Sequence, residues 1–305
     1  MAGISRYIKK LCGEGAIVVI ESTNGLLDGP LKGAGLRIFR ADPWVLSERP
    51  TNGSVSAIEL AVRATMPNHG LVELGDSGTL HHRIQEHEET IRASASTAQD
   101  LAARGAFVES CPGGTRRVSL TFDDGPNQPY TDRVLSVLGE YGVPATFFCV
   151  GLNAQSDPAT VERIAAAGHS IGNHTWSHPF LPDLGRKELE FQLDATNRAL
   201  AEVTGSAPRT VRTPYGSRTP DSLNWIADRD MTTVLWDIDT QDWANPGVDA
   251  IVRSALIGIG DGSVVLMHDG GGDRSQTVSA LPSIIESLLN DGFELVTIDH
   301  MLAAR

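Results

Sequence analysis

The sequence predicts an α/β fold in which parallel strands alternate with helices and curl into a closed or nearly closed barrel. Two features of the chain after Arg116 indicate this fold. Short apolar runs alternate there with amphipathic segments of helical period, which is typical of strand–helix–strand units with parallel strands. Polar side chains repeatedly follow the apolar runs, as they do at the carboxyl ends of barrel strands, where the catalytic residues of such enzymes lie.

Seven apolar runs are predicted to be strands, and five amphipathic segments are predicted to be helices. The strands are expected at 118–122, 145–150, 169–173, 210–213, 234–239, 263–268 and 294–298. The helices are expected at 131–141, 158–167, 186–203, 249–259 and 276–290. Pro158 directly after Asp157 favours a helix start, and Gly168 favours a helix end. We therefore expect one catalytic domain over residues 116–305.

The first 115 residues show a different and less regular pattern. Strands are predicted at 16–20 and 36–39, a short helix at 55–65 and a long helix at 79–104. The segment 111–115, Cys-Pro-Gly-Gly-Thr, is typical of a linker. We therefore expect residues 1–115 to form a smaller mixed α/β region, whose fold and role the sequence does not identify.

The composition argues against polyanionic partners and against a membrane protein. The 305 residues carry a formal net charge of −13, which repels nucleic acid and anionic membrane surfaces but not neutral sugars. No run of 18 apolar residues is present, so no transmembrane helix is expected. The apolar stretch 11–20 is interrupted by Glu14 and lacks a clear cleavage site, so a signal peptide is not expected. We expect a cytoplasmic enzyme.

Neither the cysteines nor the histidines of the first region indicate a metal site. The three cysteines are odd in number, far apart and without a CxxC pair, which is typical of buried or incidental thiols: Cys12, Cys111 and Cys149. A second cluster is more typical of a solvated helix face than of a metal centre: His81, His82, His87 and Glu88.

The segment His174-Thr-Trp-Ser-His178 places two imidazoles four residues apart. If the segment turns helically, both rings point to one side and can share a metal ion. This spacing alone is a weak signal, because a purely structural role for both histidines is the more common explanation of it.

The segment Thr121-Phe-Asp-Asp-Gly-Pro126 places two adjacent carboxylates at the end of a predicted strand. Two carboxylates at one site repel each other unless a cation or another partner offsets their charge. An Asp-Gly turn with solvated charges is the plain structural interpretation. On an extended backbone, however, Asp123 and Asp124 point in different directions, so that one can bind a metal ion while the other accepts a proton.

Three further polar groups follow later predicted strands: Arg212, the acidic segment from Asp239 to Trp243, and His268. Each taken alone has an ordinary structural explanation. Together with the carboxylates and histidines they form a complete set for hydrolysis of an unactivated amide: a metal centre with open positions, a base for water, an acid for the leaving amine and an arginine to orient a carboxylate.

These residues resemble the five motifs of the polysaccharide deacetylase family, the NodB-homology domain of carbohydrate esterase family 4. The motifs occur in family order at 121–126, 174–178, 212–215, 239–243 and 265–268. The resemblance covers roughly residues 116–302, with one small departure at Val265, where the family often has leucine. It implies a distorted (β/α)7 barrel that removes acetyl groups from chitin, chito-oligosaccharides, peptidoglycan or xylan.

The resemblance implies roles for five residues around a metal ion. Asp124, His174 and His178 would be the metal ligands, usually for Zn²⁺ and sometimes for Co²⁺. Asp123 would be the catalytic base that removes a proton from water. Arg212 would pair with Asp123 and keep it oriented and ionised.

The remaining roles concern the substrate and the leaving group. His268 would be the general acid, and Asp239 would be the carboxylate that tunes it. The backbone amide of Tyr215 would bind the oxyanion, and Trp243 and Leu266 would line the acetyl pocket. The expected substrate is an acetylated amino sugar or oligosaccharide, and the expected products are acetate and a free amine.

Two alternatives stay open from the sequence. The same fold and metal site can hydrolyse another C–N bond in a small biosynthetic substrate, which an assay for acetate release from chito-oligosaccharides distinguishes. A non-catalytic carbohydrate-binding module is the alternative from another functional class. The complete set of base, acid and metal ligands argues against it, because binding alone requires none of them.

Overall fold

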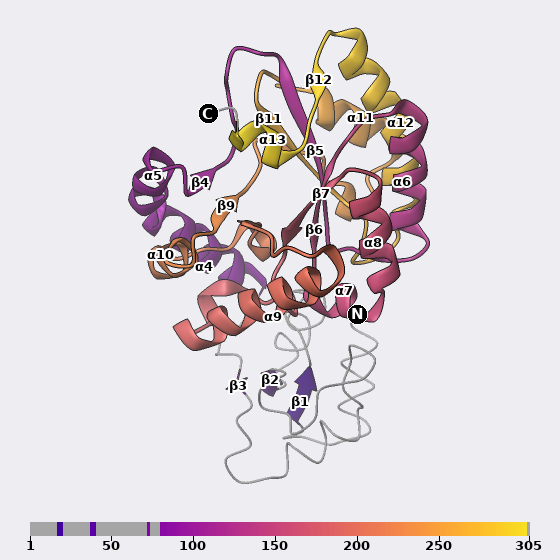
Figure 1. The fold of residues 1–305 in the computed structure, drawn as a ribbon. Helices are drawn as coiled ribbons and strands as arrows, with labels where there is room; N and C mark the ends of the chain where they lie inside the picture. Colours follow the sequence, from indigo (N-terminus) through magenta and orange to yellow (C-terminus); the bar gives the residue numbers. More distant parts are fainter. Residues whose placement is uncertain (1–16, 21–36, 41–71, 74–79, 304–305) are drawn as a thin grey trace.

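The computed structural model describes residues 17–20, 37–40, 72–73 and 80–303 (Figure 1). Its main element is a parallel sheet of nine strands, in which β10, β11, β5, β6, β7, β8, β9 and β4 follow one another and β12 pairs with β5. The strands are β4 (Phe107–Val108), β5 (Arg117–Asp123), β6 (Thr146–Cys149), β7 (Ser170–Asn173), β8 (Thr210–Val211), β9 (Thr232–Val234), β10 (Ile238–Asp239), β11 (Ser263–His268) and β12 (Glu294–Leu295). The predicted α/β fold is confirmed.

Helices cover the outer face of the curled sheet. They are α4 (Leu80–Ala93), α5 (Ala95–Ala103), α6 (Tyr130–Tyr141), α7 (Gly151–Ser156), α8 (Pro158–Ala166), α9 (Arg186–Thr204), α10 (Pro220–Ala227), α11 (Val248–Leu256), α12 (Ser275–Asn290) and α13 (Ile298–Ala303). Helices α6, α8, α11 and α12 lie together on one side of the sheet, and their apolar faces form the largest hydrophobic core with β5, β6 and β11 (Figure 1). Pro158 follows its N-cap residue Asp157, as predicted.

The alternation of residues along β5 decides which side chains face the interior of the curled sheet. Val118, Leu120 and Phe122 belong to the hydrophobic core shared with the helices. Thr121 and Asp123 have the opposite parity and therefore face the interior, although both are buried. The polar face of this central strand is thus fixed by the same pattern that fixes its apolar face.

The predicted strand 234–239 is wrong as a single element. It is divided into β9 and β10, which lie near opposite ends of the sheet. Residues 235–237 cross the opening between them: the Leu235 N–H donates to the Val108 carbonyl on one side, and the Asp237 N–H donates to the Val264 carbonyl on the other. The sheet is therefore curled but open, and this short crossing segment spans the gap between its edges.

The region before residue 116 shows two further differences from expectation. The predicted helix 79–104 is interrupted at Ser94, which separates α4 from α5. Strand β4 joins the main sheet beside β9, and α5 packs with β4 against α10 through an apolar cluster that includes Leu101 and Phe107. The main sheet therefore includes residues before the predicted boundary, and the division of the chain at residue 115 stays a prediction.

A small sheet lies earlier in the chain. Strands β1 (Ile17–Ile20) and β2 (Arg37–Arg40) are parallel, and β3 (Val72–Glu73) pairs antiparallel to β2. The strands predicted at 16–20 and 36–39 are confirmed. The predicted helix 55–65 lies outside the described residues. None of the helices in the described part of the chain combines the length and hydropathy of a transmembrane span.

One carboxylate attaches the predicted linker to the domain. Asp261, just before β11, accepts hydrogen bonds from the backbone N–H groups of Gly113, Gly114, Thr115 and Arg117. These N–H groups, led by that of Gly113, lower the pKa of Asp261 to about 2. The charged carboxylate therefore fixes the path of the chain into β5.

We expect Asp261→Asn to lower the melting temperature at pH 7, because the neutral amide accepts fewer hydrogen bonds from the linker. The folded-state pKa is depressed, so the charge stabilises the fold above the ordinary pKa of 3.8 and stops doing so as the pH falls toward 2. Urea unfolding followed from pH 7 to pH 3 should show the difference from wild type narrowing. The exposed Asp100→Asn on α5 serves as the control and should leave stability unchanged.

Candidate active site

The candidate side chains meet at the carboxyl edge of the sheet. Asp123 and His268 end the paired strands β5 and β11 and are directly opposite each other in the register. His174 follows β7, and Arg212 follows β8. Because these strands are parallel, their carboxyl ends lie at the same edge, and residues far apart in the sequence become neighbours.

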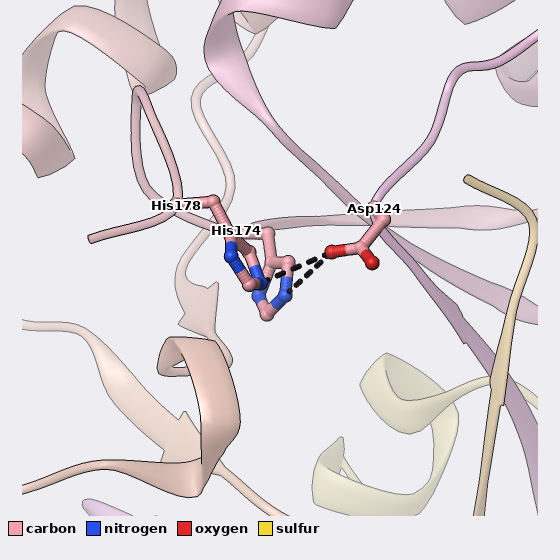
Figure 2. A group of neighbouring side chains, drawn as sticks. All are labelled: Asp124, His174 and His178. Carbon is pink, nitrogen blue, oxygen red and sulfur yellow. Dashed lines mark ion pairs between the residues drawn. The ribbon is translucent and has the colours of Figure 1, made fainter. Parts of the chain in front are cut away.

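Asp124, His174 and His178 form a candidate metal centre. One possible ligand atom from each lies within 4.8 Å of the others, and Figure 2 shows the three groups facing one another. Asp124 Oδ1 is 3.1 Å from His178 Nε2 and 3.5 Å from His174 Nε2. Within the part of the chain that the structure describes, this is the one group of histidine, cysteine and acidic side chains with such geometry.

The histidines converge by a route that differs from the helical one considered from the sequence. Residues 174–178 form turns rather than a helix, and Thr175 and His178 have positive φ angles of 65° and 56°. Asp124, with φ at 73°, lies in the same left-handed region. Non-glycine residues rarely adopt this conformation, so the backbone is strained where it presents two of the three groups.

Outer hydrogen bonds fix the orientation of both imidazoles. His174 Nδ1 lies 2.7 Å from the Arg212 carbonyl oxygen. A carbonyl only accepts, so Nδ1 carries the proton and Nε2 keeps its lone pair directed at the centre. His178 Nδ1 lies 3.2 Å from the Tyr215 hydroxyl, which leaves its Nε2 directed at the same place.

The charge of Asp124 suits a cation site. Burial alone would raise its pKa, but His178 and His174 hold the pKa well below its usual range. The carboxylate therefore stays ionised next to two imidazoles whose free nitrogens face it. A carboxylate with two imidazoles is a donor set that divalent transition metals accept, and these three residues fit such an ion.

Arg212 holds Asp123 through a buried ion pair. Its Nη1 donates to Asp123 Oδ1 at 2.8 Å, and neither side chain is more than 5% exposed. The guanidinium also donates from Nε to the Val234 carbonyl at 3.1 Å and from Nη2 to the Leu235 carbonyl at 3.0 Å. Asp123 Oδ2 lies 3.7 Å from His174 Nε2, so the second oxygen faces the metal centre.

Thr121 completes the surroundings of Arg212 and was not predicted as a site residue. Its hydroxyl donates to the Val265 carbonyl and accepts from Arg212 Nη1, both at 2.7 Å. Because the donated bond fixes the hydroxyl proton, the oxygen lone pair is directed at the guanidinium. The signal in the sequence was its position two residues before Asp123 on one face of the strand.

His268 pairs with Asp242, not with Asp239 as predicted. Asp242 Oδ1 lies 2.7 Å from His268 Nδ1, and Asp242 Oδ2 accepts from the His268 N–H at 2.8 Å and from the Thr277 hydroxyl at 2.7 Å. Asp239 instead accepts from the Gln241 N–H at 2.8 Å and is exposed. The two acids lie three residues apart, and only the turn between them decides which one is buried.

Asp242 determines the protonation state of His268. Burial alone would lower the pKa of His268, but the charge and hydrogen bond of Asp242 raise it to about 9. The imidazole is therefore a cation at neutral pH, with its Nε2 proton available to a group in the site.

Asp269 is a second buried carboxyl that was not predicted. It is fully buried, and burial together with the charges of Asp124 and Asp123 raises its pKa to about 7. It accepts from the Thr131 hydroxyl at 2.6 Å. A Cβ on Gly125 would lie 2.2 Å from Asp269 Oδ2, so a larger residue after Asp124 would displace the buried Asp269 carboxyl. Gly125 is therefore packed against a buried carboxyl, whereas the plain structural interpretation of the sequence was a solvated Asp-Gly turn.

The residues expected to contact the acetyl group lie around the same edge. Tyr215 is in a 3₁₀ turn, Pro214–Gly216, and its ring centroid is 4.7 Å from that of His178. Trp243, on the turn Asp242–Ala244, is 54% exposed. Leu266 is buried within β11, opposite Thr121. Their roles toward a substrate stay predictions.

Comparisons with known proteins decide the family. The family model described as polysaccharide deacetylase matches residues 111–234. A chitooligosaccharide deacetylase of Sinorhizobium fredii is 41% identical over 191 residues, which is 59% of this chain and 89% of that protein. A peptidoglycan-N-acetylglucosamine deacetylase of Bacillus cereus is 39% identical over 64% of this chain and 72% of its own length. This chain belongs to the polysaccharide deacetylase family.

Solved structures agree with this membership. The Bc1960 peptidoglycan N-acetylglucosamine deacetylase is 37% identical, with a TM-score of 0.65 over 67% of this chain and 96% of that one. A family 4 carbohydrate esterase from Streptomyces lividans, solved with acetate, is 35% identical, with a TM-score of 0.55 over 59% of this chain and 91% of that one. The resemblance seen in the motifs is confirmed, and the chain is a deacetylase of the hydrolase class.

Substitution of Asp242 or Asp239 by asparagine should show which of the two acids determines the pH dependence of kcat. A general acid acts in its protonated form, so kcat falls as the pH rises through the pKa of His268. Asp242→Asn removes the charge that raises this pKa, so we expect the alkaline limb to move to lower pH. A bound cation would lower the pKa of His268 in wild type and in both variants alike, so the order of the limbs is the quantity to compare. Asp239→Asn, the matched control, should leave the limb where it is in wild type.

Removal of the Thr121 hydroxyl should slow the reaction without loss of the metal. We expect Thr121→Val to leave one Arg212 donor unsatisfied and to loosen Asp123, which costs roughly 1–3 kcal/mol and lowers kcat by about 5-fold to 160-fold. Thr121→Ser should restore the rate. Thr233→Val is the matched control, because Thr233 is also buried in the sheet but its hydroxyl makes no hydrogen bond. Equal kcat values for the two valine variants would contradict this role.

Proposed function

We propose that this deacetylase hydrolyses the N-acetyl group of an amino sugar in an oligosaccharide or glycan, releasing acetate and a free amine. The observation that carries the proposal is the opposition of Asp123 and His268 across the strand pair β5–β11, beside the candidate metal centre. One group is an arginine-paired carboxylate and the other an acid-paired imidazolium. A carboxylate and an imidazolium beside one centre suit water activation and leaving-group protonation.

The proposed metal ligands are Asp124, His174 and His178. They would hold a divalent cation, Zn²⁺ in our proposal and Co²⁺ as the alternative, which would supply polarisation of the acetyl carbonyl and acidification of water. The outer partners of the imidazoles, the Arg212 carbonyl and the Tyr215 hydroxyl, keep the rings from rotating away.

Asp123 is the proposed catalytic base. The ion pair with Arg212 occupies Oδ1 and fixes the orientation of the carboxylate, while Oδ2 faces the centre at 3.7 Å from His174 Nε2. Asp123 takes a proton from water as the oxygen attacks the acetyl carbon. Arg212 has no contact with substrate in this scheme and acts as a positioning residue.

His268 is the proposed general acid. Its imidazolium donates a proton to the nitrogen as the bond between that nitrogen and the acetyl carbon breaks. Asp242 stays charged and holds Nδ1, so that Nε2 donates. In one turnover Asp123 gains one proton and His268 loses one. Proton exchange with solvent then restores both groups.

Tyr215, Trp243 and Leu266 are the proposed substrate contacts. The backbone N–H of Tyr215 stabilises the oxyanion, and the Trp243 and Leu266 side chains enclose the methyl group of the acetyl. We propose N-acetylglucosamine oligomers as the substrate class, because relatives are named as chitooligosaccharide and as peptidoglycan-N-acetylglucosamine deacetylases.

An acetate-release assay with metal control tests this function. We expect acetate from chito-oligosaccharides or peptidoglycan fragments, loss of activity on chelation, and recovery on addition of Zn²⁺ or Co²⁺. Asp124→Ala should lose metal binding and turnover together. His268→Ala should keep the metal, measured by elemental analysis, and lose roughly 10²–10⁴-fold in kcat, as expected for removal of a general acid.

Two results would contradict the proposal. Retained turnover in metal-free Asp124→Ala would remove the metal from the reaction. Acetate release from small acetylated metabolites but from no sugar oligomer would assign the site to the alternative class of small-molecule C–N hydrolysis.

A further inference from the structure

The turn that carries the proposed oxyanion donor has an unusual backbone. Tyr215 has φ of 61° and ψ of 10°, and the next residue, Gly216, has φ of 62°. Two successive residues in the left-handed region form a conformation that a tyrosine does not favour by itself. Contacts from elsewhere must therefore hold the Pro214–Gly216 turn in place.

Arg218 provides one such contact. Its Nη1 donates to the Gly216 carbonyl at 2.8 Å, and its side chain is only 12% exposed. The guanidinium lies 5.8 Å from the ring centroid of Phe107, and its Nη2 is 3.6 Å from Glu109 Oε1. Phe107 and Glu109 come from β4 and the residue after it, before the first residue of the family match, 111.

A series of rings provides the second contact. His87 on α4 lies edge-on to Phe180, with ring centroids 5.6 Å apart. Phe180 is buried and lies 6.4 Å from the Tyr215 ring, and the Tyr215 hydroxyl is 3.2 Å from His178 Nδ1. This series runs from a helix outside the family match to a proposed metal ligand.

The two contacts begin at different places in residues 87–109 and meet at one turn. One reaches the turn through its carbonyl at Gly216, and the other reaches it through the Tyr215 side chain. The packing of α5 and β4 against α10 holds this stretch against the catalytic domain. The contacts of the Glu109 carboxylate are weakened by its 51% exposure, so the bond from Arg218 and the apolar packing are the stronger links.

We propose that residues 87–109, here called the support segment, hold the oxyanion turn of this enzyme in its active conformation, with Arg218 and Phe180 as the positioning residues through which they act. This inference rests on the proposed role of the Tyr215 N–H. The support segment stabilises the transition state indirectly, since a misplaced N–H no longer points at the developing oxyanion. The Arg218 contact ends at the Gly216 carbonyl and reaches no proposed metal ligand, so metal binding and ground-state affinity do not depend on that contact.

Kinetics of the full-length metal-loaded enzyme test the Arg218 contact. Arg218→Met removes the donor to Gly216 and keeps an aliphatic chain over Phe107, so we expect kcat to fall roughly 10-fold to 100-fold, with KM and metal content unchanged. Arg218→Lys keeps a donor and should recover part of the rate. Arg229→Met is the matched control, because Arg229 is also a partly buried, ion-paired arginine but contacts Glu190 and Asp194 on α9. It should lower the melting temperature without changing kcat.

A second pair of variants tests the ring series. His87→Ala should lower kcat at unchanged KM, whereas Glu89→Ala, an exposed position on the same helix, should not. In a double-mutant cycle, His87→Ala and Arg218→Met should lower kcat less than multiplicatively, because each loosens the same turn.

The outcomes separate this inference from the proposed function. If wild type releases acetate and Arg218→Met retains the kcat of Arg229→Met, the support segment has no role in catalysis while the deacetylase assignment stands. If Arg218→Met loses metal or raises KM as strongly as it lowers kcat, the contact supports the whole site rather than the turn, and the inference is overturned. If wild type releases no acetate, the proposed function itself fails.

Discussion

The buried guanidinium of Arg212 is the group on which the rest of the site depends. Removal of a charge from water costs several kcal/mol, and Arg212 is fully buried. Asp123, the hydroxyl of Thr121, two backbone carbonyls and the face of Phe148, 4.2 Å from the guanidinium carbon, offset that cost. The carbonyls belong to Val234 and Leu235, where the chain leaves β9 to cross the opening of the sheet. The Arg212 side chain therefore connects the candidate base to the segment that spans the gap between the sheet edges. The backbone carbonyl of Arg212 orients His174.

Carboxyl groups and cationic groups lie close together in the site. Three carboxyl groups, those of Asp123, Asp124 and Asp269, lie at the carboxyl ends of β5 and β11, and each has different neighbours. Asp123 has the guanidinium of Arg212, Asp124 has two imidazoles, and Asp269 has a pKa raised to about 7 by burial and by its charged neighbours. On the other side, His268 is held as a cation by Asp242. Distinct surroundings thus shift the pKa of Asp124 down and the pKa of Asp269 up, although both are carboxyl groups at the same edge of the sheet.

The candidate active site is packed against residues that lie outside the family match. The proposed base, Asp123, and the proposed metal ligands lie within residues 111–234, which match the family model, and the proposed acid, His268, follows that range. The contacts of Arg218 and Phe180 reach into residues that precede the family match. The candidate active site is therefore packed, at the Pro214–Gly216 turn, against residues that precede the family match.

The sequence by itself determined the strands that carry the site and the identity of most polar groups on them. Apolar runs and their period report which residues are buried and on which face, so β5 and β11 and the groups at their ends were predictable from local pattern. Tertiary structure alone decided the partners. Asp239 and Asp242 have the same chemistry three residues apart, and the choice between them follows from a turn in which Gln241 has φ of 54°. The division of 234–239 into two strands follows from the gap in the curled sheet, which no local pattern records. Thr121 acts on Arg212, which is 91 residues away in the sequence, and only the packed chain brings the hydroxyl and the guanidinium within hydrogen-bond distance.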